Sequence, residues 1–453
     1  MEIHRRTFMA RLGGAAAVGV VASTPRAQRN AGLPTLDPQA FRDRANADGE
    51  FAATARFWNA HVRMDIGEAS FDAFIREGRM AEFAPSTGAG DPDVRIAGPA
   101  ELWSAASGAG PATAQGFQSR SPRVEGDNVG HIWPYQRAIL RLVGLVRETF
   151  TGPATVSLVE DVDREFDSAV GRYAYVRIQG VQYRVYYEEA GQGIPMVLQH
   201  TAGADGRQWR HLLEDRELQQ KYRMIAYDLP YHGKSLPPTG VAWWTQEYRL
   251  TTELLMDSVV AMTHALKLDR PIYMGCSVGG YLAPDLALYR PDEFRAVVGI
   301  NSGLGSGRSG ADREPARALG NSHQNNAYFG TRMYMITSSV APEPFRRETG
   351  WVYSQGGPGV FAGDIYYYSV DHDLTGGRAK GIDTSKIGVH FLTGEYDPEV
   401  SGPNGTAALV ADIPGCTYDI IKGGSHFAMC DNYPLFRQYL LPVLDRIPTL
   451  EIG

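Results

Sequence analysis

The segment Gly275–Gly279 reads GCSVG and places Ser277 two residues from a glycine on either side. It follows the apolar run Pro271–Met274 and leads into a predicted helix that extends to Tyr289. A strand that turns this tightly into a helix pushes the serine hydroxyl out of the fold, where it can act as a nucleophile. Glycines suit the flanking positions because a strained backbone at the serine leaves no room for side chains there. The same residues could form a turn without a chemical role, so the partners of Ser277 decide between the two interpretations.

A serine hydroxyl needs a general base and an acidic group that orients the base. His426 is the candidate base, because it lies in a glycine-rich loop directly after the strand predicted over Tyr418–Lys422. Asp397 is the candidate acid and Glu395 the alternative, because both follow the strand predicted over Val389–Leu392. These loops lie at the carboxyl edge of the predicted sheet, where the active sites of α/β proteins form.

Alternating strands and helices supply the framework for these loops. Predicted strands lie at 173–178, 182–188, 195–199, 222–227, 271–275, 296–300, 389–394 and 418–422, with helices at 254–266 and 279–289. This order predicts a mainly parallel, doubly wound α/β sheet with helices on both faces. The interval of about 302–384 interrupts the alternation and is rich in Tyr, Gly, Pro and Arg, which predicts an inserted cap over the catalytic face.

These motifs resemble those of the α/β-hydrolase family, in particular its esterases and meta-cleavage-product hydrolases. The order Ser277, Asp397, His426 is the order of that family, and differs from the chymotrypsin and subtilisin orders. The segment Asp228–Ser235, DLPYHGKS, is similar to the Asp-x-x-Gly-x-Gly-x-Ser loop of the family. The resemblance spans about Tyr173–Leu444 and implies an α/β-hydrolase fold with a cap.

The resemblance also implies an oxyanion hole of two backbone N–H donors. Val278, next to the nucleophile, would supply the first. Many relatives carry His-Gly after the strand that corresponds to 195–199, and the next residue donates, which makes Ala202 the second donor. Thr201 replaces the usual glycine here, and Tyr231 replaces another in the Asp228 loop, while His232 is expected to be structural.

The predicted reaction is hydrolysis of a carboxylic ester through an acyl-enzyme. Carbon–carbon bonds of the meta-cleavage-product type, amides and lactones stay open as substrates, because the fold does not choose among them. A serine nucleophile argues against epoxide and haloalkane hydrolysis. Aromatic residues of the cap and the pair Trp243-Trp244 favour a small-to-medium hydrophobic substrate, although each ring could equally pack the cap. The cap aromatics are Tyr328, Phe329, Tyr334, Trp351, Tyr353, Phe361, Tyr366, Tyr367 and Tyr368.

The composition narrows the possible partners. With 453 residues, 43% of them hydrophobic, the chain is long enough for two domains. A net charge of −7 and the absence of a basic patch argue against nucleic-acid binding. No sequence feature suggests a metal or an organic cofactor. Cys416 and Cys430 could form a disulfide in an oxidising compartment, but a buried thiol is the commoner state of an isolated cysteine.

The start of the chain resembles a twin-arginine export signal. Arg5-Arg6 precedes the Gly/Ala-rich apolar run Leu12–Ala22, which is too short to span a bilayer. We therefore expect an export signal at 1–30, a periplasmic or secreted protein, and no stable membrane insertion. A linker at 31–45 would follow.

An accessory α+β domain is predicted over 46–167, before the hydrolase domain at 168–453. Its order of strand, glycine turn, strand and helix weakly resembles sterol-carrier-like folds, and the stretch 108–126 is expected to form a loop. It could bind a lipid or a partner, which would make an exported binding module the alternative function. It could also join copies of the chain in a homo-oligomer.

Overall fold

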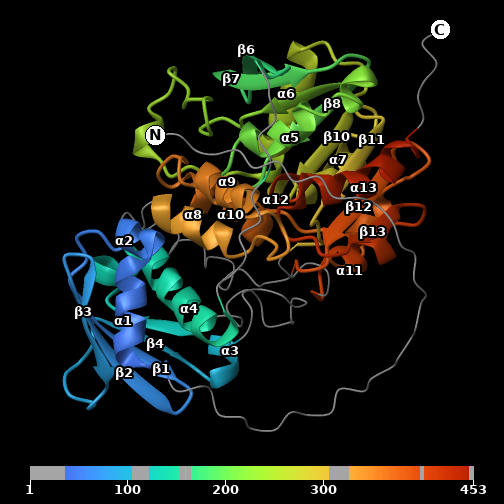
Figure 1. Ribbon diagram of the computed structural model, residues 1–453. Helices are drawn as coiled ribbons and strands as arrows, with labels where there is room; N and C mark the ends of the chain where they lie inside the picture. The colour runs from blue at the N-terminus through green and yellow to red at the C-terminus, as the bar shows by residue number, and fades with distance from the viewer. Residues whose placement is uncertain are drawn as a thin grey trace, which may run out of the picture. The chain divides into compact units, whose positions relative to one another are not determined.

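An eight-stranded sheet dominates the second half of the chain, in the order β13-β12-β11-β10-β8-β9-β7-β6 (Figure 1). Strands β8 to β13 pair in parallel, whereas β6 and β7 form an antiparallel hairpin at one edge. The strands are β6 Val170–Ile178, β7 Val181–Ala190, β8 Ile194–Gln199, β9 Tyr222–Tyr227, β10 Ile272–Cys276, β11 Ala296–Ile300, β12 Gly388–Gly394 and β13 Thr417–Ile421. The predicted mostly parallel sheet is confirmed, with each strand within a few residues of its expected bounds.

Helices cover both faces of this sheet because its central strands are apolar on both sides. On β8, Val197 contributes to the core under α6 (Thr252–Ala265) and α7 (Val278–Tyr289). Its neighbours Met196 and Leu198 contribute to the opposite core. That second core is covered by α5 (Arg210–Leu213), α12 (Ala428–Asp431) and α13 (Tyr433–Leu444).

A helical insertion lies between β11 and β12, within the interval predicted as a cap. Its described helices are α8 Asn326–Tyr334, α9 Glu343–Tyr353, α10 Val360–Tyr366, the π-helix η8 Tyr367–Asp371 and the 3-10 helix η9 Arg378–Gly381. Helices α8 and α9 approach closely at two glycines: a Cβ on Gly330 would lie 2.6 Å from the carbonyl oxygen of Gly350. Small residues at this crossing let the two backbones touch.

The first half of the chain contains a separate five-stranded sheet in the order β3-β2-β1-β4-β5. Its strands are β1 Ala60–Ile66, β2 Ala69–Arg76, β3 Arg79–Pro85, β4 Val94–Gly98 and β5 Arg123–Gly126. Its helices are α1 Pro38–Ala47, α2 Gly49–Thr54, α3 Ala100–Ser104, the π-helix η2 Asn128–Ile132 and α4 Gln136–Thr151. In Figure 1, α1 and α4 cross the same face of this sheet.

Two expectations for this first half need correction. The stretch of 31–45, predicted as a linker, includes most of α1, whose Phe41 is buried against Phe83 with ring centroids 4.7 Å apart. The stretch predicted as a loop up to Gly126 ends in β5, which pairs antiparallel with β4. Both elements depend on partners distant in sequence, so local pattern alone did not indicate them.

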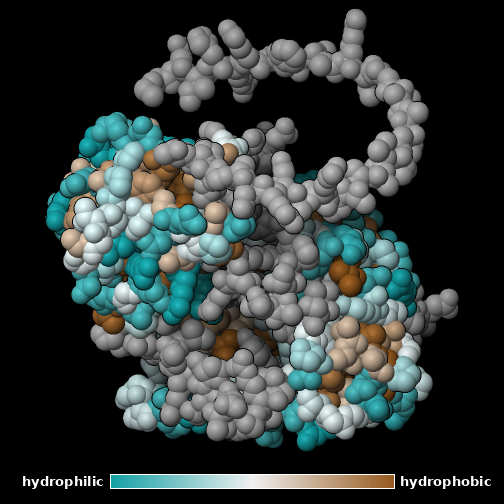
Figure 2. Space-filling model, turned by 90° about the horizontal axis from the view of Figure 1, so that it is seen from below, coloured by the Kyte–Doolittle hydropathy of each residue, from teal (hydrophilic) through white to brown (hydrophobic). Residues whose placement is uncertain are grey.

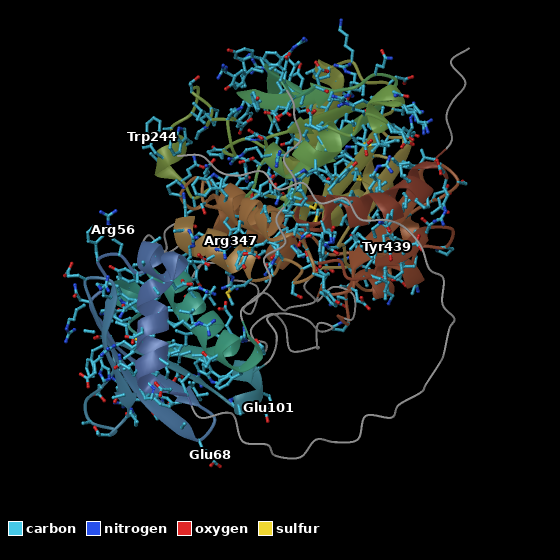
Figure 3. The ribbon with its side chains drawn as sticks, in the orientation of Figure 1. Arg56, Glu68, Glu101, Trp244, Arg347 and Tyr439 are labelled. Carbon is cyan, nitrogen blue, oxygen red and sulfur yellow. The ribbon has the colours of Figure 1, made fainter. Side chains whose placement is uncertain are left out.

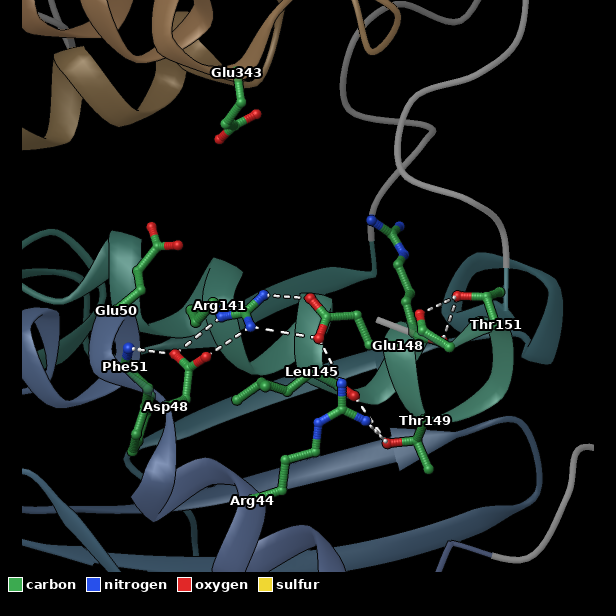
Figure 4. Close-up of polar contacts among 12 residues, drawn as sticks. Arg44, Asp48, Glu50, Phe51, Arg141, Leu145, Glu148, Thr149, Thr151 and Glu343 are labelled. Carbon is green, nitrogen blue, oxygen red and sulfur yellow. Dashed lines mark hydrogen bonds and ion pairs between the residues drawn. The ribbon is translucent and has the colours of Figure 1, made fainter. Parts of the chain in front are cut away.

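Arg141 on α4 holds the junction of α1 and α2 in place (Figure 4). Its guanidinium donates to Asp48 at 2.7 Å and to Glu148 at 2.6 Å. Asp48 also caps α2 by accepting the N–H of Phe51 at 2.7 Å. Although burial acts in the opposite direction, the hydrogen bonds that Arg141 donates to the two carboxylates raise the pKa of its guanidinium.

The computed structural model describes residues 36–104, 122–152, 159, 165–305, 326–397 and 402–447, all within one unit that begins at Leu36. The predicted export signal therefore lies outside the described residues. Within these ranges, no helix is both long and apolar enough to cross a bilayer. On the face drawn in Figure 2, hydrophobic residues form small separate groups among hydrophilic ones.

Candidate active site

Ser277 lies at the turn between β10 and α7, as its motif predicts. Its backbone has φ 56° and ψ −115°, outside the regions that residues with side chains usually adopt. The surrounding structure holds this conformation: the Ser277 N–H donates to the carbonyl oxygen of Ile300 at 2.9 Å, and its own carbonyl oxygen accepts the N–H of Tyr281 at 2.8 Å. The residue is 6% exposed.

The two glycines of the motif are required by close contacts. A Cβ on Gly275 would lie 2.6 Å from the carbonyl carbon of Gly279, and a Cβ on Gly279 would lie 2.6 Å from Cγ of Gln199. Both distances are shorter than any van der Waals contact, so a larger residue would displace the turn. This agrees with the steric argument made from the sequence.

The structure brings Asp397 to His426. The carboxylate oxygen Oδ2 of Asp397 is hydrogen-bonded to Nδ1 of His426, and Asp397 is fully buried. Glu395, the alternative acid, faces away from the histidine: its carboxylate accepts the N–H of Gly423 at 2.9 Å and contacts Nζ of Lys422 at 3.2 Å. The hydrogen bonds from Gly423 and Lys422 lower the pKa of Glu395. Geometry therefore selects Asp397 as the partner of His426.

Asn301 ties the three loops of the site together, and sequence reasoning missed it. It directly follows β11, is fully buried and has a left-handed φ of 53°. Its side-chain N–H donates to the carbonyl oxygen of His426 at 2.8 Å, and its side-chain oxygen accepts the N–H of Gly394 at 2.9 Å. The thiol of Cys276, next to the nucleophile, donates to the same His426 carbonyl at 3.2 Å. A polar residue at the carboxyl end of an all-apolar strand was the signal in the sequence.

The loop after β8 lies beside the nucleophile turn because β8 and β10 are neighbours in the sheet. The N–H of Thr201 donates to the side chain of Gln208 at 2.9 Å, and the N–H of Gly203 donates to Asp364 at 2.7 Å. Between them, the N–H of Ala202 has no acceptor among the described residues. Val278 begins α7, and the first N–H groups of a helix have no acceptor inside it. The Ala202 N–H is therefore open to an incoming acceptor, and the Val278 N–H remains a predicted donor by its place at the start of α7.

The departures from the usual glycines have different consequences. Thr201 does not adopt a positive φ, so glycine is not needed there, and its hydroxyl donates to Gln208 at 3.0 Å within the loop. Tyr231 adopts a φ of 74°, which glycine would reach without strain. Its ring lies 4.7 Å from the ring of Tyr248 and 6.3 Å from the ring of Trp243. Aromatic packing thus accompanies the strained backbone at Tyr231.

His200 and His232 are buried beside this loop, and their environments shift their pKa values in opposite directions. The pKa of His200 is lowered to about 4 by burial, and its Nε2 accepts the N–H of Leu229 at 3.1 Å. His232 contacts two oxygen acceptors, the carbonyl of Pro230 at 2.9 Å and the carboxylate of Asp364 at 2.7 Å. Although burial alone would lower it, the charge of Asp364 raises the pKa of His232. His232 is thus bonded at both ring nitrogens, to the Pro230 carbonyl and to Asp364, which are the contacts expected of a structural residue.

The aromatic residues of the insertion differ in how exposed their side chains are. Tyr353 and Tyr367 are buried in the packing of the insertion, whereas Trp351 is 61% exposed. Trp244, before the insertion, is 70% exposed and projects from the surface in Figure 3. The two tryptophans therefore do not line an enclosed pocket, and packing is the better interpretation for Tyr353 and Tyr367.

The remaining candidate groups form neither a metal site nor a disulfide. Cys416 and Cys430 are free thiols, and the Cys430 sulfur lies 3.3 Å from the Thr349 hydroxyl instead. In the part of the chain that the structure describes, no group of three or more His, Cys, Asp or Glu side chains could hold a metal ion.

Comparison with known proteins identifies the fold to which the eight-stranded sheet belongs. The family model for the alpha/beta hydrolase fold matches residues 194–330. The solved structure of a thermophilic esterase from Thermogutta terrifontis superposes with a TM-score of 0.53 at 18% identity, covering 61% of this chain and 100% of that chain. The chain therefore has the α/β-hydrolase fold, extended by a separate five-stranded sheet at its N-terminal side.

Curated relatives match over a shorter stretch. Bifunctional epoxide hydrolase 2 of Sus scrofa is 28% identical over 187 residues, which cover 39% of this chain and 32% of that protein. Epoxide hydrolase 4 of Mus musculus is 30% identical over 137 residues, which cover 30% of this chain and 36% of that protein. The chain thus spans about a third of the length of these relatives.

Proposed function

We propose that this protein is a serine hydrolase that cleaves a carboxylic ester of a small-to-medium hydrophobic substrate. The observation that carries the proposal is the hydrogen-bonded pair of Asp397 and His426, whose backbone is tied to the strained turn of Ser277. A fully buried carboxylate stabilises the imidazolium that forms when the histidine takes a proton. A purely structural turn would not need this arrangement.

In the proposed mechanism, Nε2 of His426 takes the proton of the Ser277 hydroxyl as the oxygen attacks the ester carbonyl. Asp397 holds Nδ1–H of the ring and so leaves Nε2 as the base. The N–H groups of Val278 and Ala202 would donate to the tetrahedral oxyanion. Collapse of that intermediate expels the alcohol, which receives the proton from His426. Water, activated by the same histidine, then releases the acid and restores Ser277.

The residue type of the nucleophile distinguishes the proposed ester hydrolysis from the epoxide hydrolysis in the names of the matched relatives. Those relatives are epoxide hydrolases. The epoxide hydrolases of this fold use an aspartate as nucleophile, whereas this chain has Ser277 at the corresponding turn. A serine alkoxide forms an acyl-enzyme that water can hydrolyse, which suits esters and lactones. We therefore expect no hydrolysis of an epoxide, which serves as the negative control among the substrates.

A fluorophosphonate probe and a substrate panel test the proposal. The panel contains p-nitrophenyl esters of increasing chain length, an anilide, a lactone, a 2-hydroxy-6-oxo-dienoate and a styrene-type epoxide. We expect labelling of Ser277 and fastest turnover of a short ester, both abolished in Ser277→Ala with a loss on the order of 10⁶-fold. Substantial activity of Ser277→Ala on any panel member would overturn the proposal.

We further propose export by the twin-arginine route. The support is Arg5-Arg6 ahead of the apolar run Leu12–Ala22. Changing both arginines to lysine should retain the protein in the cytoplasm of a bacterial host, as measured by cell fractionation. A single Arg42→Lys change serves as control, because Arg42 lies on α1 and outside the signal. Equal export of all three proteins would contradict the proposal.

A further inference from the structure

We propose that Asp364, on α10 of the insertion, is a positioning residue for the oxyanion hole. The inference rests on the proposed function and adds a role for the insertion: beyond covering the site, it orients the loop that carries the Ala202 N–H. Three observations support it: the contacts of Asp364, the contacts of neighbouring residues of the insertion, and the order of anchored peptides along the loop.

Asp364 is fully buried and accepts hydrogen bonds from three separate segments. Its Oδ2 accepts the N–H of Gly203 at 2.7 Å and the ring N–H of His232 at 2.7 Å. Its Oδ1 accepts the hydroxyl of Tyr248 at 3.0 Å. A buried carboxylate is costly unless its oxygens are bonded in this way, so the three partners hold Asp364 and are held by it.

Other residues of the insertion contact the loop that contains Ala202. Gly203 has a φ of 69°, and a Cβ on it would lie 2.6 Å from Cδ2 of Phe361, one turn before Asp364. The hydroxyl of Tyr353, at the end of α9, is hydrogen-bonded to the hydroxyl of Thr201. Two helices of the insertion therefore contact the oxyanion loop on both sides of Ala202.

The positions of these hydrogen bonds along the loop explain how they would orient the Ala202 N–H. The Ala202 N–H belongs to the peptide between Thr201 and Ala202. The peptide before it is held through the Thr201 N–H by Gln208, and the peptide after it is held through the Gly203 N–H by Asp364. Fixing both neighbours sets the plane of the middle peptide, and hence the direction of the donor. Oxyanion donors act through such preorganisation, and removing one costs about 10²–10³-fold in kcat.

The alternative is that Asp364 only stabilises the fold, and the chain contains a matched pair that tests this. Asp285 on α7 and His372 of the insertion form a second buried His–Asp pair, with Nδ1 and Oδ2 2.8 Å apart. Asp285 also accepts a tyrosine hydroxyl, that of Tyr367, at 2.5 Å. This pair links the insertion to the core, and within the described residues it makes no hydrogen bond with the loop after β8. Asp285→Ala is therefore the control for Asp364→Ala.

The experiment compares kcat, KM and the melting temperature of the full-length protein on the best substrate of the panel. We expect Asp364→Ala to lower kcat by about ten- to hundredfold with KM within about threefold. Asp364→Asn should recover most of kcat, because its amide oxygen still accepts the Gly203 N–H. Asp285→Ala should lower the melting temperature by a similar amount while kcat stays within about threefold.

Equal losses of kcat in Asp364→Ala and Asp285→Ala, or no recovery in Asp364→Asn, would overturn the positioning role. If Asp364→Ala does not fold, Asp364→Glu replaces it, because an added methylene displaces the carboxylate from Gly203 and keeps the charge. Where no panel member is turned over, the rate of fluorophosphonate labelling of Ser277 gives the same comparison. Loss of labelling in Ser277→Ala tests the proposed function and not the role of Asp364. A wild-type protein that hydrolyses no panel member and is not labelled by the probe would overturn both proposals.

Discussion

At the scale of single residues, the site depends on side chains that never touch the substrate in the proposed mechanism. Asn301 donates to the carbonyl oxygen of His426 and accepts the N–H of Gly394, so one amide joins the loop of the base to the strand that leads to the acid. Its left-handed backbone is one of the conformations that asparagine tolerates better than most residues. The residue type is thus suited both to the turn and to the two bonds.

Asn301→Asp should lower kcat by about tenfold or more, because a carboxylate keeps the acceptor for Gly394 but cannot donate to the His426 carbonyl. The control is Asn46→Asp, since Asn46 bridges the backbone of Met80 in the same way, donating at 2.9 Å and accepting at 2.9 Å, outside the site. The measurement is kcat and thermal melting for both variants. An unchanged kcat in Asn301→Asp would show that the tie to His426 is not needed.

Gly279→Ala should reduce activity by at least about a hundredfold, since its Cβ would lie 2.6 Å from the side chain of Gln199 and 3.0 Å from the Gln199 carbonyl oxygen. Overpacking of this kind also costs about 1–3 kcal/mol of stability. Gly240→Ala is the control, because no atom lies within 4 Å of a Cβ there. Steady-state rates and urea denaturation measure the two effects. Near-normal rates in Gly279→Ala would mean that the turn can relax without moving Ser277.

At the scale of elements, an ion pair fastens α9 of the insertion to α5 of the core. Glu348 on α9 accepts two hydrogen bonds from the guanidinium of Arg210 on α5. Burial alone would raise the pKa of Glu348, but the hydrogen bonds from Arg210 and the nearby imidazole of His211, whose Nε2 lies 3.4 Å from the carboxylate, lower it to about 2. Because α9 also carries Tyr353, which contacts the oxyanion loop, this attachment supports the site indirectly.

Glu348→Gln should destabilise the protein at neutral pH by roughly 1–3 kcal/mol, and the difference from wild type should shrink in acid. A carboxylate whose pKa is depressed in the folded state contributes stability above its ordinary pKa of 4.5, and this contribution is lost as the pH falls toward 2. Denaturation at pH 7 and pH 3 measures it. Glu217→Gln, at the exposed ion pair with Arg437, is the control. A difference that is the same at both pH values would contradict this assignment.

At the scale of the whole molecule, the five-stranded sheet and the α/β-hydrolase fold have separate interiors. The two large clusters of buried hydrophobic side chains in the hydrolase fold contain no residue before Val176. Within the described ranges, the candidate catalytic residues and the hydrogen-bond partners named above lie between Gln199 and His426. The chemistry should therefore tolerate a loss of stability confined to the first sheet.

Arg141→Ala tests this separation. It leaves Asp48 and Glu148 without their shared cation, which should destabilise the first sheet and its helices by about 2–4 kcal/mol. We expect kcat at low temperature to stay within about twofold of wild type while a melting transition moves down. Arg123→Ala, whose ion pair with Glu125 is exposed, should change neither. A large fall of kcat in Arg141→Ala would show that the first region acts on the site.

The amino-acid sequence by itself determined the features that depend on neighbours in the chain. Alternating apolar segments predicted the positions of the strands and a mainly parallel sheet, and GCSVG between a strand and a helix placed Ser277 at a strained turn. Both predictions rest on local properties of the chain. The periodicity of strands and helices and the conformational freedom of glycine extend over only a few residues. Even so, α1 and β5 were missed, because their partners lie elsewhere in the chain.

Only the tertiary structure decided which side chains meet across the fold. Asp397 and Glu395 stand two residues apart, and the sequence favoured Asp397 but left Glu395 open; in the structure one contacts His426 and the other contacts Lys422. Asp364 and Gly203 are 161 residues apart and meet because α10 of the insertion returns over the carboxyl edge of the sheet. Such contacts follow from the packing of whole elements, which no local pattern encodes, and the proposed role of Asp364 rests on that packing.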